Sequence, residues 1–171
     1  MKGRKAQQVA LTGMFVALAF VLSYIENIIP ISIGIPGVKL GLANLVVMVA
    51  LYTLGYRDAL FLSIIRIVLV GFTFGSLASM MYSLAGGLLS FLVMVLAKKS
   101  EKLSISGVSV LGGVSHNLGQ LLIAMLLVEN GKLFFYFPVL CLSGTVAGIG
   151  IGLLAAMVTK RVKKVLKHDK E

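Results

Sequence analysis

The 171-residue sequence is poor in charge and cysteine, and it has no tryptophan. Charged residues make up 13 %, where a typical soluble domain has about 25 %. Cys141 is the only cysteine and has no partner in the chain, which excludes a disulfide scaffold. High hydrophobicity excludes a disordered chain, and the lack of a glycine period excludes collagen.

Motifs for enzymatic chemistry are also missing. The sequence has no G-x-x-x-x-G-K-[ST], so it does not bind ATP through a P-loop. The only aspartates, Asp58 and Asp169, cannot form an aspartate cluster for magnesium. His116 and His168 are far apart in sequence and do not indicate a metal or haem site. We therefore expect a protein that is not an enzyme and holds no cofactor or metal.

Apolar residues are abundant, at 58 % of the chain, and the mean hydropathy is +1.02. A soluble domain of this size could not bury so much apolar surface, which indicates a multi-pass protein of the cell membrane. We predict an all-α integral membrane fold with one domain over residues 1–171 and a basic tail over 160–171. The six apolar segments are 7–29, 40–56, 59–72, 77–97, 104–128 and 133–159. The third would be only about 21 Å long at about 1.5 Å per residue. It could be a short helix sheltered by its neighbours, or one of its ends could be a loop that lines a cavity.

The distribution of lysine and arginine predicts the orientation. If six helices cross and both termini are cytoplasmic, thirteen of the sixteen basic residues lie on the cytoplasmic side. Lys39 and Lys132 then lie outside, and Arg66 lies within a helix. This asymmetry explains the net charge of +10 better than nucleic-acid binding does. The basic start and long apolar run of the first segment predict a retained helix rather than a signal peptide.

Polar residues in or near the apolar segments mark a candidate substrate-binding site, because lipid excludes such groups unless they have a role. His116 and Gln120 share one helix face, and Asn117 is a neighbour of Gln120. Their estimated depths place these groups in the middle or outer half of the membrane, where one outward-facing cavity could gather them. The candidate residues are Glu26, Lys39, Asn44, Arg66, His116, Asn117 and Gln120.

Structural roles remain alternatives for the same residues. Arg66 could hold backbone carbonyls or pair with Glu26. Asn117 and Gln120 could join helices by hydrogen bonds, and Lys39 could anchor in the headgroup region.

One loop and two sets of small residues give further information on how the helices are connected and packed. The segment PISIGIPGVKLG, residues 30–41, contains two prolines and three glycines and could fold over the mouth of a bundle or lie among headgroups. Small residues recur at helical spacing at Ala6, Ala10, Gly13 and Ala17, and again at Gly144, Gly148 and Gly152. Such residues let helices approach closely, within one chain or between chains.

Several of these residues carry a resemblance to a known family. The blocks KLGLAN at 39–44, YSLAGG at 82–87 and SVLGGVSHNLGQ at 109–120, together with Arg66, resemble the Gx transporter family. That family is also labelled heptaprenyl diphosphate synthase component I, and it is similar to the substrate-binding S components of energy-coupling factor (ECF) transporters. The resemblance covers nearly the whole chain. It implies six helices, cytoplasmic termini and an outer substrate site closed by the first loop.

The resemblance also implies partners. An S component docks on a transmembrane coupling subunit through small residues of its first helix, which here match Ala10, Gly13 and Ala17. ABC-type ATPases would supply the energy. The sequence thus predicts capture of a small anionic or polar molecule. A non-catalytic subunit of a prenyl diphosphate synthase and a self-sufficient secondary transporter are the alternatives. The absence of repeats and of membrane carboxylates disfavours the last.

Overall fold

The computed structural model describes residues 2–28 and 41–168. Helices account for 91 % of the structure, and the described ranges contain no strand, which confirms the all-helical prediction. The elements are α1 (Lys2–Ile28), α2 (Leu42–Thr53), α3 (Tyr56–Thr73), α4 (Leu77–Lys99), α5 (Ile105–Val128), the 3₁₀ helix η1 (Gly131–Tyr136) and α6 (Phe137–His168).

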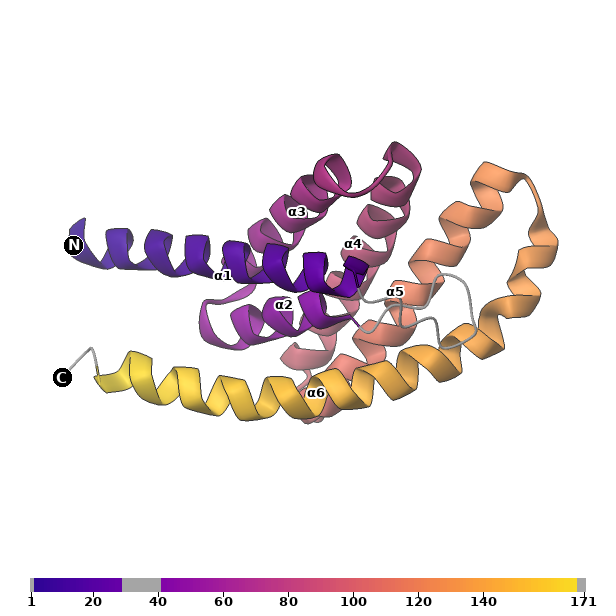
Figure 1. Ribbon diagram of the computed structural model, residues 1–171. Coiled ribbons are helices and arrows are strands. Elements are labelled where there is room, and N and C mark those ends of the chain that lie inside the picture. The colour runs from indigo at the N-terminus through magenta and orange to yellow at the C-terminus, as the bar shows by residue number, and fades with distance from the viewer. Residues whose placement is uncertain (1, 29–40, 169–171) are drawn as a thin grey trace.

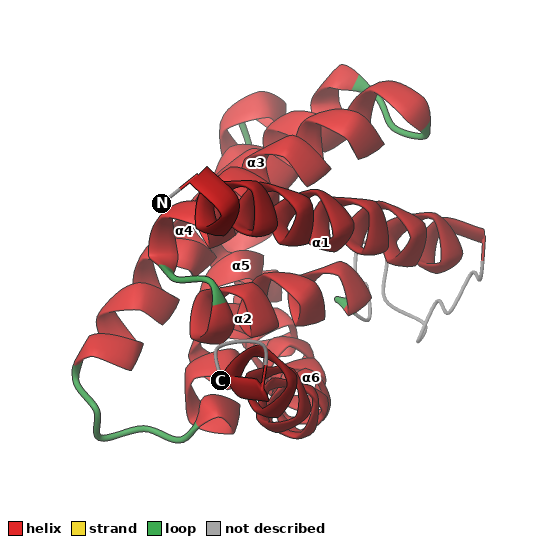
Figure 2. Ribbon diagram, turned by 90° about the vertical axis from the view of Figure 1, so that its left-hand side faces the viewer, coloured by secondary structure: helices red, strands yellow, loops and turns green. Residues whose placement is uncertain are grey.

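The helices form one bundle whose two chain termini lie at the same end (Figure 1). We call this the terminal end and the opposite one the far end. Helix α1 runs away from the terminal end, and the long α6 returns to it. Figure 2 shows α2 between α1 and α6, with the tilted α3, α4 and α5 behind them.

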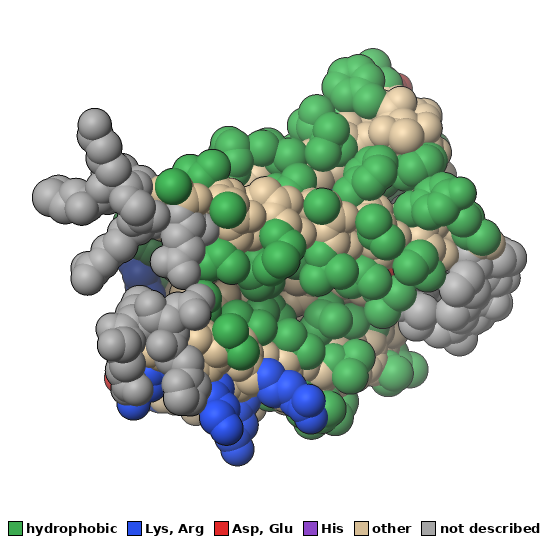
Figure 3. Space-filling view, turned by 60° about the vertical axis from the view of Figure 1, so that its left-hand side comes forward, with side chains coloured by type: hydrophobic (Ala, Val, Ile, Leu, Met, Phe, Trp, Pro, Cys, Tyr) green, Lys and Arg blue, Asp and Glu red, His purple; other side chains and the backbone are tan. Residues whose placement is uncertain are grey.

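Within residues 2–28 and 41–168, four segments are long and apolar enough to cross a membrane. They are Gln8–Ile28, Leu77–Lys99, Ile105–Val128 and Gly131–Lys167. The face drawn in Figure 3 is broadly apolar, and lysine and arginine side chains gather along one edge of it. Large hydrophobic side chains are also exposed on α1, α3, α4, α5 and α6. Such a surface suits lipid rather than water. Six crossings and cytoplasmic termini stay predictions.

Helix α2 lies at the centre of the core. It has 12 residues, and every side chain from Val46 to Leu51 is buried. An apolar helix can be enclosed by protein or by lipid, and the burial of these side chains shows that other helices surround α2. Phe15 and Ala19 of α1, Leu62 of α3 and Ala155 of α6 belong to the same buried cluster.

The second and third helices have other boundaries than the sequence predicted. Helix α2 ends at Thr53, and α3 begins at Tyr56, because Gly55 between them adopts a left-handed φ of 103°. Asp58 then lies in the first turn of α3, where a negative charge favours helix formation. Helix α3 has 18 residues, so the prediction of a third helix of about 21 Å was too short.

The last helix also differs from the prediction. The apolar segment expected at 133–159 begins as the 3₁₀ helix η1, and α6 continues through the basic tail to His168. Residues 153–168 contain no glycine or proline, so nothing in the sequence stops the helix. Val162, within this tail, packs against the core cluster.

Two polar contacts join helices near the terminal end. Gln8 Nε2 of α1 donates to Asp58 Oδ2 of α3 at 2.5 Å. Lys98 Nζ of α4 donates to the backbone carbonyl of Leu51 at 2.6 Å and lies 4.7 Å from the centre of the Tyr52 ring. These bonds hold α1 to α3 and α4 to α2.

Candidate functional site

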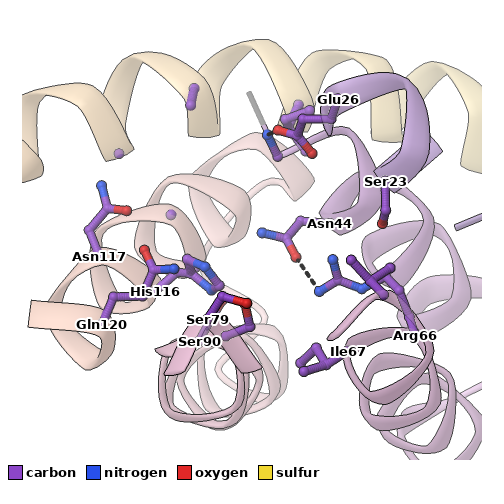
Figure 4. A pocket seen from close by; sticks show the side chains of 18 of the residues that line it. Ser23, Glu26, Asn44, Arg66, Ile67, Ser79, Ser90, His116, Asn117 and Gln120 are labelled. Carbon is purple, nitrogen blue, oxygen red and sulfur yellow. Dashed lines mark hydrogen bonds between the residues drawn. The ribbon is translucent and has the colours of Figure 1, made fainter. Parts of the chain in front are cut away.

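A cavity of about 490 Å³ opens among the helices, and all six α-helices contribute to its lining. This volume lies within the range of about 300–1,000 Å³ that small-molecule sites occupy. The cavity brings together every described member of the predicted site: Glu26, Asn44, Arg66, His116, Asn117 and Gln120 (Figure 4).

Arg66 projects from α3 into one wall of the cavity. Its Nη2 donates to Asn44 Oδ1 of α2 over a long 3.3 Å, and its Nε is buried with no hydrogen-bond partner among the described residues. The charge of Glu26 attracts Arg66, yet the described structure contains no ion pair between them. A guanidinium has five N–H donors, so Arg66 keeps capacity for a further acceptor.

Glu26 lies near the end of α1 and ties that end to the start of α2. Its Oε1 accepts from the backbone N–H of Gly41 at 2.5 Å. Gly41 has a left-handed φ of 78°, which glycine adopts without strain, and its carbonyl accepts the first backbone bonds of α2. The carboxylate therefore has a structural contact and a second oxygen for another donor.

The opposite wall comes from α5 and is polar, with no acidic, lysine or arginine side chain among its described residues. His116, Asn117 and Gln120 all line the cavity on this side (Figure 4). Asn117 Nδ2 donates to the Leu140 carbonyl of α6 at 2.7 Å and to Ser143 Oγ at 3.3 Å. The amide nitrogen of Asn117 thus joins α5 to α6, as the structural alternative for this residue requires.

Two consecutive glycines of α4, Gly86 and Gly87, allow this helix to pack closely between the two walls of the cavity. A Cβ on Gly86 would lie 2.8 Å from Cγ of Gln120 and 3.1 Å from Cε1 of His116. A Cβ on Gly87 would lie 2.8 Å from Cδ1 of Ile67, the residue after Arg66. Because neither glycine has a side chain, α4 packs closely against both α5 and α3. This close packing places Arg66 and His116 across one cavity.

The sequence analysis did not predict several residues that line the part of the cavity nearer the terminal end of the bundle. Ser90 and Met94 of α4, Ser109 of α5 and Met48 of α2 line the cavity. Ser109 and His116 are seven residues apart, and so are Ser83 and Ser90, which also both line it. Two helical turns place such pairs on one face, so small polar residues at this period could have indicated the cavity.

Two predicted elements lie outside the described residues. Lys39 and the loop 30–41, apart from Gly41, belong to the range 29–40 that the structure does not describe. Their predicted roles stay predictions. In the described ranges, no three His, Cys, Asp or Glu residues gather as metal ligands would.

The two sets of small residues differ in environment. Ala10, Gly13 and Ala17 on α1 are exposed, and a Cβ on Gly13 would meet nothing within 4 Å. Gly144, Gly148 and Gly152 on α6 instead face α5, where a Cβ on Gly148 would lie 2.6 Å from the Cα of Val110. The α6 glycines therefore serve packing within the chain, and the α1 set does not.

The apolar helices, the lipid-compatible surface and the polar cavity define a multi-pass membrane protein with a small-molecule-sized site. The family described as heptaprenyl diphosphate synthase component I matches residues 15–158. The chain belongs to this family, which confirms the resemblance to it. No curated protein and no solved structure is significantly similar to the chain.

Proposed function

We propose that this protein is the substrate-binding subunit, or S component, of an ECF-type uptake transporter in the cell membrane. It captures a small polar or anionic molecule from the outer face and is not an enzyme. A transmembrane coupling subunit and ABC-type ATPases supply the energy. Both chain termini are cytoplasmic in this proposal, so the terminal end faces the cytoplasm.

The observation that carries the proposal is the position of Arg66. A charged side chain inside an apolar bundle is costly and needs a role. Arg66 lines the cavity, and its one described hydrogen bond is a long one to the neutral Asn44. A purely structural arginine would be expected to have its donors satisfied by carbonyls or a carboxylate. This favours a ligand as the missing partner.

The exposed small-residue face of α1 supports the choice of partner. Ala10, Gly13 and Ala17 make no close packing within the described bundle. Small residues allow another helix to approach closely in the membrane, where dispersion and backbone contacts drive association. A coupling subunit can use this face while the cavity, on the other side of α1, remains accessible.

A double substitution on α1 tests the proposal. Ala10→Trp with Ala17→Trp should abolish co-purification with the coupling subunit and the ATPases, because the bulky rings hold the partner helix away. Val146→Trp with Leu153→Trp is the matched control: these α6 side chains are 64 % and 56 % exposed and have the same spacing. The control should assemble normally. Assembly of the α1 variant at the normal level would refute this docking face.

The family description favours a second candidate, a non-catalytic membrane subunit associated with a prenyl diphosphate synthase. The same purification separates the two functions. Recovery of a soluble prenyl synthase with the wild-type chain, in place of the coupling subunit and ATPases, would select the second candidate.

A further inference from the structure

We infer that the ligand of this cavity is dipolar: it carries an acidic group that binds Arg66 and a basic or N–H-rich group that binds Glu26. This inference rests on the proposed substrate-binding role and narrows it to one class of small molecule.

The charges of the described lining support this class. Glu26 and Arg66 are the charged residues among the described residues that line the cavity, so their formal charges cancel. The two attract each other but form no ion pair in the described structure. Each is held by a different neighbour, Arg66 by Asn44 and Glu26 by the N–H of Gly41.

Both groups keep unused hydrogen-bonding capacity. The guanidinium has five N–H donors and the carboxylate has two oxygens with about four acceptor sites. One hydrogen bond to each side chain is present in the described structure. Figure 4 draws Asn44 between them, so a ligand that reaches both charges passes Asn44.

Charge matching then selects among ligands. A monoanion would pair with Arg66 but would leave the carboxylate of Glu26 without a positive partner. A monocation would pair with Glu26 but would leave Arg66 without a negative partner. An uncompensated charge in a low-dielectric site is unfavourable, so a molecule with both charges matches the described lining best. The polar wall that includes Gln120 can hydrogen-bond the uncharged middle of such a molecule.

Ligand retention from a complex mixture tests the inference, because the mixture offers many charge classes to the cavity at once. The full-length protein in detergent is equilibrated with an aqueous yeast extract, washed and denatured, and the released compounds are identified by mass spectrometry. We expect enrichment of compounds that carry both an acidic and a basic group. Enrichment of simple monoanions or monocations, or of nothing, would overturn the inference.

Charge-removing variants make the test specific. Arg66→Gln and Glu26→Gln should each lower retention of the wild-type compound at least about tenfold, equivalent to about 1.4 kcal/mol. Glu26→Gln should shift retention toward monoanions and Arg66→Gln toward monocations. Arg66→Lys keeps the charge and should retain dipolar compounds, which guards against a folding defect. Retention of the same compound at an unchanged level by Glu26→Gln would contradict the inference.

Matched controls lie outside the cavity. Arg57→Gln removes an exposed arginine from the same helix as Arg66, and Glu129→Gln removes an exposed carboxylate after α5. Both should retain the wild-type compound. A third outcome separates this inference from the proposed function. If the wild-type chain retains a dipolar compound but no coupling subunit co-purifies with it from the native membrane, this inference stands and the transporter assignment is rejected.

Discussion

At the scale of single residues, Gly86 of α4 lies directly against His116 and Gln120 of α5. Gly86→Ala would place a methyl group into both, so we expect a loss of about 1–3 kcal/mol of unfolding free energy, typical of overpacking. Ligand retention should fall as well, because His116 and Gln120 must move. Equilibrium unfolding in mixed detergent and the retention assay measure the two effects.

Gly150→Ala is the control for Gly86→Ala. A Cβ on Gly150 would meet nothing within 4 Å, and alanine favours a helix over glycine. This variant should be as stable as the wild type or slightly more stable. Equal stability of the two variants would mean that α4 and α5 are not in close contact at Gly86.

Asn117 provides a second prediction at this scale. Replacing it by Leu removes the hydrogen bonds to the Leu140 carbonyl and Ser143 of α6. Hydrogen bonds between membrane helices contribute about 0.6 kcal/mol on average and about 1.7 kcal/mol at most. Unfolding measurements should therefore show a loss in this range. A stability unchanged from the wild type would argue against this link between α5 and α6.

The sequence predicted the polar side of the cavity better than its packing. Arg66 and His116 could be recognised because lipid excludes such side chains, and both line the cavity. The role of Gly86 could not be predicted, because it depends on which helix lies opposite. A glycine in an apolar helix is equally compatible with a contact to another chain, to lipid or to a ligand.

At the scale of the elements, α5 and α6 are joined through the glycines of α6. A Cβ on Gly148 would lie 2.6 Å from the Cα of Val110, and one on Gly144 would lie 2.9 Å from the carbonyl of Gly113. These neighbours are backbone atoms, so the helices themselves must separate to admit a side chain. Gly148→Ala should therefore lower the unfolding free energy by at least about 1 kcal/mol.

The comparison of Gly148→Ala with Gly150→Ala isolates this effect. Both replace a glycine of α6, but only Gly148 faces α5. The same denaturation experiment serves for both. If the two variants unfold alike, α5 and α6 do not pack through this face.

Helix boundaries were harder to predict than helices. Apolar runs marked the position of each helix, but the break at Gly55 depends on a left-handed backbone that hydropathy does not report. The tail was predicted as a hydrophilic segment because of its lysines, although lysine is a good helix former. Packing of Val162 against the core then extends α6 beyond the apolar run.

At the scale of the whole molecule, the number of crossings depends on α2 and α3, because neither is among the four long apolar spans of the described residues. The proposed topology requires α3 to cross. Cysteine labelling tests it in a Cys141→Ser background. Arg57 lies in the first turn of α3, and Leu77, the first residue of α4, follows the other end of α3; both are exposed. An impermeant maleimide should label Leu77→Cys in intact cells and Arg57→Cys only after permeabilisation. Labelling of both from the same side would show that α3 does not cross.

The central claim is that this chain captures a molecule for an ATP-driven module. The most direct test is uptake of the compound retained in the extract experiment, measured in cells with radiolabelled material. The account predicts that uptake requires this chain and stops when the P-loop lysines of the partner ATPases are replaced. Uptake that continues with inactive ATPases, or that is unchanged when this chain is deleted, would contradict it.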